Sequence, residues 1–199
     1  MLQLRVELDT RRARLIAALE RGRSVAYCHR LWSEFVRFRD GSRCVVCGAT
    51  EYLSAHHILR KSFLECFRFE TGNGISLCKG CHQEAHAIFN GKADVSYPMD
   101  AQGGEKIELM SELLGYLAFD AKERGLLSDH YYYLSDGYLS VCKQFQGLPS
   151  HQTFPGTRLE QAYWIWKQTP RETLQAILRE NGLELPKNFI QVGPISIIC

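Results

Sequence analysis

The sequence predicts an α+β protein in which a small cysteine-rich segment lies between two helical regions. The chain has 199 residues, enough for one medium domain or two small ones. Apolar residues recur at helical spacing near both ends of the chain, whereas residues 42–92 contain only short apolar runs separated by glycines. We therefore expect an N-terminal basic helical region (1–41), a compact core with strands (42–92) and a mostly helical C-terminal region (93–199).

The composition excludes several classes of protein. Hydrophobic residues make up 45% of the chain and charged residues 23%, which is ordinary for a globular protein and excludes a disordered or fibrous one. No apolar run reaches the ~18 residues that span a bilayer. Charged residues, Arg5 and Glu7 among them, interrupt the N-terminus where a secretory signal would be apolar. We expect a cytoplasmic protein with no membrane partner.

The N-terminal region is expected to form two basic helices. The first should end near Gly22, and the second should run from about Ser24 to Phe38. Residues 1–43 contain ten arginines and five acidic residues, a net charge of +5, whereas residues 93–199 carry a net charge of −4. Such a patch is typical of a protein that follows a DNA backbone, although a solvated helix face with no ligand explains the charge equally well.

The C-terminal region is expected to be helical and largely structural. Its apolar stripes and capping signals predict helices at 107–118, 131–145, 158–168 and 170–181. The last two could form a helix-turn-helix, but their short linker and acidic surroundings favour a structural pair or a dimer interface. The run Tyr131-Tyr132-Tyr133 is expected to pack in the core rather than to stack on bases.

Two C-x-x-C pairs lie in the middle of the chain. They are Cys44-x-x-Cys47 and Cys78-x-x-Cys81. In a reducing compartment this pattern favours a metal site over disulfides, and four thiolates can surround one zinc ion tetrahedrally. A structural Zn²⁺ would also supply the folding free energy that such a small segment lacks. The alternative is four unligated core cysteines.

Four histidines accompany the cysteines and suggest a second metal. His82 and His86 are four residues apart on a predicted helix over 81–90, so they should lie on the same face. Together with His56 they could hold a metal ion. A zinc ion ligated by four thiolates has no open position for catalysis, so this second site would be the open one.

The same stretch resembles the HNH endonuclease family. The resemblance rests on Arg39-Asp40-Gly41-Ser42-Arg43, Cys44-Val-Val-Cys47-Gly48, Ala55-His56-His57-Ile58, Asn73-Gly74-Ile75-Ser76-Leu77-Cys78 and Cys81-His82. It implies a ββα-metal fold and the hydrolysis of phosphodiester bonds in DNA. It also implies a catalytic divalent ion: Mg²⁺, Mn²⁺ or another transition ion.

The resemblance assigns roles residue by residue. It implies that His57 is the general base and that Asn73 orients it, whereas Asn90 is expected only to cap a helix. His56 and His82 would be ligands of the catalytic ion, and His86 a further ligand. The residues expected to contact DNA phosphates are Arg39, Arg43, Arg60 and Lys61, the last two being solvated loop charges in the alternative interpretation.

Several functions are compatible with these residues. The first is a metal-dependent endonuclease acting on double-stranded DNA, such as a homing, phage-encoded, restriction or defence nuclease. One module cuts one strand, so a monomer would nick and a homodimer could cut both strands. The alternatives are a non-catalytic zinc module that binds nucleic acid or protein, and an RNA-directed or toxin-like nuclease.

Overall fold

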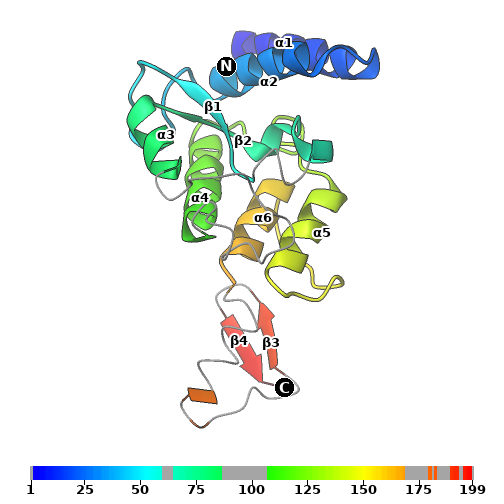
Figure 1. Ribbon diagram of the computed structural model, residues 1–199, viewed down its shortest axis with the longest axis vertical. Coiled ribbons are helices and arrows are strands. Elements are labelled where there is room, and N and C mark those ends of the chain that lie inside the picture. Colours follow the sequence, from blue (N-terminus) through cyan, green and yellow to red (C-terminus); the bar gives the residue numbers. More distant parts are fainter. Residues whose placement is uncertain are drawn as a thin grey trace.

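The computed structural model in Figure 1 describes residues 2–59, 65–86 and 107–168, and a few residues further on: 179–180, 182, 189–192 and 195–198. The structure is α+β, as predicted: helices combined with small two-stranded antiparallel sheets. The helices and strands are α1 (Leu2–Glu20), α2 (Val25–Arg39), β1 (Ser54–His57), β2 (Gly74–Leu77), α3 (Lys79–His86), α4 (Ile107–Glu123), α5 (Asp136–Phe145), α6 (Arg158–Trp166), β3 (Phe189–Val192) and β4 (Ile195–Ile198). Two short 3-10 helices, η1 (Glu65–Phe67) and η2 (Thr71–Asn73), lie between β1 and β2.

Helices α1 and α2 lie side by side at one end of the molecule (Figure 1). Gly22 follows α1 with a positive φ of 59°, a conformation that glycine adopts at little cost. Ser24 caps α2, because its side chain accepts a hydrogen bond from the Tyr27 amide. The predicted end of the first helix and start of the second are therefore confirmed.

The sheet that carries the histidines is a hairpin-like pair of strands. β1 pairs antiparallel with β2, so that His56 lies opposite Ile75 and His57 opposite Gly74. Gly74 allows α2 to pack directly on β2, since a Cβ there would lie 2.6 Å from the Trp32 ring. Helix α3 follows β2 after one residue and packs against both strands.

The C-terminal region packs three helices, with α4 and α6 in the most extensive contact. Gly115 permits this approach, because a Cβ at that position would lie 2.9 Å from the Tyr163 ring. The capping box predicted from Thr157 and Glu160 is present at the start of α6. None of the helices in the described part of the chain is both long and apolar enough to cross a membrane.

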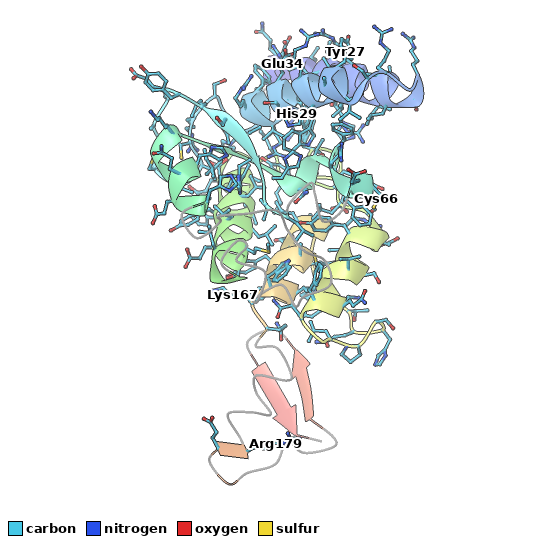
Figure 2. All side chains as sticks on the ribbon, viewed as in Figure 1. Tyr27, His29, Glu34, Cys66, Lys167 and Arg179 are labelled. Atoms are coloured by element: carbon cyan, nitrogen blue, oxygen red, sulfur yellow. The ribbon has the colours of Figure 1, made fainter. Side chains whose placement is uncertain are left out.

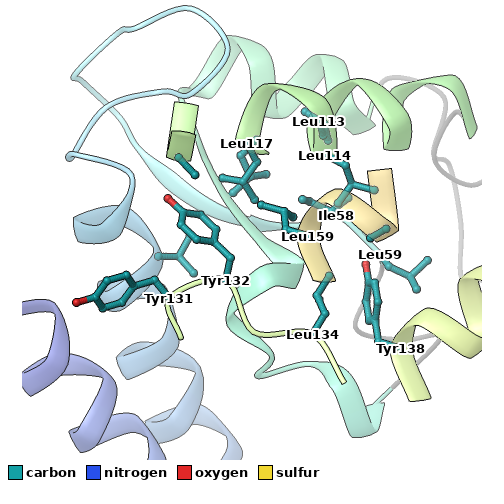
Figure 3. Close-up of a cluster of buried hydrophobic side chains, with 14 of the residues drawn as sticks. Ile58, Leu59, Leu113, Leu114, Leu117, Tyr131, Tyr132, Leu134, Tyr138 and Leu159 are labelled. Carbon is teal, nitrogen blue, oxygen red and sulfur yellow. The ribbon is translucent and has the colours of Figure 1, made fainter. Parts of the chain in front are cut away.

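The predicted helix over 131–145 begins later than expected. Ser135 caps α5, and its side chain accepts a hydrogen bond from the Tyr138 amide, so the helix starts at Asp136. Tyr131 and Tyr132 precede the helix and are buried in the core, as Figure 3 shows. The expectation of core packing is therefore right for these two tyrosines, while Tyr133 is 43% exposed.

A buried ion pair connects the hairpin to both helical regions. Arg39 is fully buried, and its guanidinium donates hydrogen bonds to Asp40 (2.8 Å) and to the carbonyls of Thr71 (2.5 Å) and Gly74 (2.6 Å). The same guanidinium lies 4.1 Å from the centre of the Tyr132 ring. The expectation that Arg39 contacts DNA is wrong, because its donors are used inside the protein.

Candidate metal centres

Four cysteines converge at the junction of the hairpin and α3. Cys44 and Cys47 lie in a turn closed by Gly48, whose amide donates to the Cys44 carbonyl (2.9 Å), while Cys78 and Cys81 come from the end of β2 and the start of α3. Their sulfur atoms all lie within 4.8 Å of one another. A second contact holds the first pair in place, because Val45 N–H donates to the Ser76 carbonyl on β2 (2.9 Å).

This group could hold a structural metal ion. Four sulfur donors at close range are the ligand set that Zn²⁺ takes in structural sites. A hydrogen bond from the Cys81 amide lowers the pKa of Cys78 to about 7, so that a thiolate is available there near neutral pH. Burial raises the pKa of Cys81, which a bound cation would offset by favouring the thiolate. The donor set therefore fits the predicted zinc ion.

Three histidines form a second cluster on the same hairpin and helix. The ligand nitrogens of His56, His82 and His86 lie within 4.8 Å of one another. The Nε2 atoms of His82 and His86 are 3.2 Å apart, because residues four apart share one face of α3. The His56 ring centre is 5.2 Å from that of His82 and 4.8 Å from that of His86.

The chemistry of this cluster fits a metal with open coordination positions. Burial lowers the pKa of His82, which favours the neutral ring that binds metals. Three imidazoles leave at least one position of a tetrahedral ion for water or substrate. The structure thus brings together the three histidines that the sequence suggested as ligands of a second ion, and it could hold one there.

His57 lies in a different environment from His56. Successive side chains of a strand point to opposite faces, and the His57 ring faces α2 rather than α3. It stacks on Trp32, with ring centres 4.0 Å apart and planes inclined by 11°. The ring centre of His29, which is also on α2, lies 5.7 Å from that of His57 (Figure 2 labels His29). Its Nε2 lies 2.8 Å from the carbonyl oxygen of Arg68, which can only accept, so Nε2 carries the proton in the neutral ring and the lone pair is on Nδ1.

Asn73 forms hydrogen bonds to the backbone of the two residues that follow His57. Its Oδ1 accepts a hydrogen bond from Leu59 N–H (2.8 Å), and its Nδ2 donates to the Leu59 carbonyl (2.9 Å). The Asn73 carbonyl also accepts from Ile58 N–H (3.0 Å). The backbone and side chain of Asn73 together thus extend the β1–β2 pairing to Ile58 and Leu59, which is compatible with the predicted orienting role.

The expected DNA contacts fall into three groups. Arg39 is buried, as described above. Arg43 is partly exposed and pairs with Asp120 on α4. Arg60 and Lys61 lie outside the described residues, as do Asn90 and most of the expected helix over 170–181.

Sequence reasoning missed the residues around His57. These residues are Trp32 and His29 on α2. Their spacing of three residues on α2 would have placed them on one helix face, but nothing local indicates that this face covers β1.

In comparisons with known proteins, no family model matches this chain, and no curated protein or solved structure matches it either. Membership of the HNH family therefore stays a prediction that rests on the chain's own residues.

Proposed function

We propose that this chain is a metal-dependent endonuclease of the HNH type that hydrolyses phosphodiester bonds in DNA. The observation that carries the proposal is the cluster of His56, His82 and His86, built on two antiparallel strands and the helix that follows them. A four-cysteine group on the same small unit supports it, because a structural metal there would hold the hairpin and helix together.

In this proposal the three histidines hold the catalytic ion. When bound, a divalent cation would stabilise the negative charge that develops on the phosphate during cleavage. Three imidazole ligands suit Mn²⁺ and other transition ions better than Mg²⁺, which prefers oxygen. Zn²⁺ at the four thiolates would have a structural role only.

His57 would act as the general base. A neutral imidazole is the form that can accept a proton from water, and the contact with the Arg68 carbonyl places the ring's own proton on Nε2. The Arg68 carbonyl fixes this tautomer and the Trp32 ring fixes the plane of the imidazole. Asn73 would hold the backbone on the C-terminal side of His57 in place.

DNA is the proposed substrate because of the charge of the N-terminal helices. The guanidinium groups of Arg23 and Arg30 both lie 5.1 Å from the centre of the Tyr27 ring on α2. Such exposed arginines contact phosphates without reading sequence. The proposal includes double-stranded DNA as the partner, with a homodimer as the form that would cut both strands.

The test is cleavage of supercoiled plasmid with Mg²⁺, Mn²⁺, Co²⁺ or EDTA. The wild type is compared with His82→Ala and with the control His151→Ala, which alters an exposed histidine in the turn after α5. We expect metal-dependent cutting by the wild type and the control, and a loss of at least ~100-fold in His82→Ala with bound zinc unchanged. The ratio of nicked to linear product reports whether one strand or two are cut.

Two results would contradict the proposal. Cleavage by His82→Ala at the wild-type rate would exclude the histidine cluster as the catalytic centre. No cleavage of DNA by a wild type with its zinc intact would instead support a non-catalytic zinc module. Cleavage of RNA but not DNA would show that the substrate is RNA.

A further inference from the structure

We infer that Tyr138, on α5 in the C-terminal region, is a positioning residue for the proposed nuclease centre. The inference rests on the proposed function and deepens it. Tyr138 would act through Asn73, which in turn holds the backbone next to His57. The C-terminal helices would then be a working part of the catalytic module rather than an appended unit.

The contact is direct and buried. The Tyr138 hydroxyl donates to Oδ1 of Asn73 (3.0 Å), and the same oxygen accepts from Leu59 N–H. Tyr138 is fully buried and Asn73 is 2% exposed, so water does not substitute readily for either bond. One amide oxygen thus connects α5 to the second residue after His57.

The Leu59 backbone determines which way the Asn73 amide points, and the Tyr138 hydroxyl adds a third hydrogen bond to the same arrangement. With Oδ1 facing two donors, Nδ2 faces the Leu59 carbonyl, and all three bonds are satisfied at once. Rotation of the amide by half a turn would place an NH₂ group against Leu59 N–H. Phenylalanine at position 138 keeps the ring but removes the hydrogen bond that holds Oδ1 from the side of α5.

Residues 133–135, which precede α5, also hold residues 70–72 around the start of η2. Gly72 N–H donates to the Tyr133 carbonyl (2.8 Å), and Ser135 N–H donates to the Glu70 carboxylate (3.0 Å). The Glu70 carbonyl accepts from the Trp32 indole (3.2 Å), and Trp32 is the ring on which His57 stacks. Residues 133–138 therefore support both the backbone that follows His57, through Asn73, and the Trp32 ring on which His57 stacks, through Glu70.

The experiment compares Tyr138→Phe with the matched control Tyr132→Phe. Tyr132 is also fully buried, but its hydroxyl accepts a hydrogen bond from Arg124 (3.3 Å) rather than contacting Asn73. Both variants lose one buried hydroxyl and keep their rings. Amide hydrogen exchange at Leu59 and steady-state cleavage of a DNA oligonucleotide are measured in the zinc-loaded protein.

We expect Leu59 exchange to rise about fivefold in Tyr138→Phe, the factor that corresponds to a hydrogen bond of about 1 kcal/mol. The kcat should fall by a similar factor with KM unchanged, since DNA binding does not involve this buried bond. Tyr132→Phe should change neither quantity beyond its effect on global stability.

The two proposals can fail separately. Equal Leu59 exchange and equal kcat in the two variants would overturn the positioning role. A rise in KM with unchanged kcat would also overturn it. A wild type that cuts no DNA would overturn the proposed function, while the exchange measurement would still decide whether Tyr138 holds Asn73.

Discussion

Replacement of Arg39 by methionine should destabilise the fold rather than weaken DNA binding. Arg39 is fully buried and donates to the Asp40 carboxylate and to the carbonyls of Thr71 and Gly74. Methionine fills most of the volume but removes every donor. The Asp40 carboxylate, which is also fully buried, would then keep its hydrogen bond from Ser76 N–H (2.8 Å) and lose its partner charge.

The expected loss can be worked from these contacts. Breaking one partner of a buried ion pair costs about 3–5 kcal/mol, and the loss of the Arg39 donor at the Gly74 carbonyl adds about 1–3 kcal/mol. The Thr71 carbonyl keeps a hydrogen bond from Gly74 N–H, so it adds less. A domain of this size is stable by only about 5–15 kcal/mol. Arg39→Met should therefore lose at least about 4 kcal/mol, or fail to fold at 37 °C.

The loss should also depend on pH. Burial raises the pKa of the Asp40 carboxyl and Arg39 opposes that shift, so without the arginine the folded-state pKa rises further. A carboxyl whose pKa is higher in the folded state costs stability above its unfolded-state pKa of about 4. The deficit of Arg39→Met should grow as pH rises through that value and shrink below it.

The assay is urea unfolding followed by circular dichroism, with zinc present throughout. Arg11→Met is the control, because Arg11 is partly exposed and pairs with Glu7 on the surface, so that variant should lose less than about 1 kcal/mol. The double variant Arg39→Met/Asp40→Asn should be more stable than Arg39→Met alone, since it removes the uncompensated acid. If Arg39→Met folded as well as Arg11→Met but bound DNA more weakly, Arg39 would be a phosphate contact and the buried pair would be wrong.

Three further substitutions, one of them with a matched control, test the remaining structural claims. Cys78→Ser should abolish stoichiometric zinc in a metal assay, whereas Cys66→Ser, an exposed cysteine, should keep it. Gly72→Ala should lose about 1–3 kcal/mol in thermal unfolding, because its Cβ would lie 2.7 Å from a backbone carbonyl; an unchanged midpoint would show that the segment can move aside. Thr157→Ala should lose about 1 kcal/mol through its cap on α6, and an effect near zero would mean that the capping box contributes little in this chain.

The cysteine and histidine clusters could be predicted from the sequence because the spacings that create them are short. The spacing within each C-x-x-C pair is set by turn geometry, and the four-residue spacing of His82 and His86 by helix geometry. The start of α2 at Ser24 and the capping box at Thr157 are local in the same sense, and both are present. The element order of two strands followed by a helix also agrees with the prediction.

The missed features depend on contacts between distant segments. An arginine is normally exposed, and Arg39 is buried because Asp40 and two carbonyls of the distant segment 70–74 accept its hydrogen bonds. The helix expected from Tyr131 fails because Ser135 caps the chain four residues later and the tyrosines pack into the core instead. The stack of His57 on Trp32 requires α2 to lie on the hairpin, and the helical pattern of α2 does not reveal its partner.

The change in composition at residues 41 and 92 does not mark a break in packing. Arg39 and Trp32 reach the hairpin from the N-terminal side, whereas Tyr138 and the Tyr133 carbonyl reach it from the C-terminal side. Both sets of contacts end on residues 70–74, the segment that pairs with β1 next to His57. A fragment of residues 42–92 could keep its cysteines and histidines and still lose the supports on which the proposed roles of His57 and Asn73 depend, because those supports lie in the helices on either side.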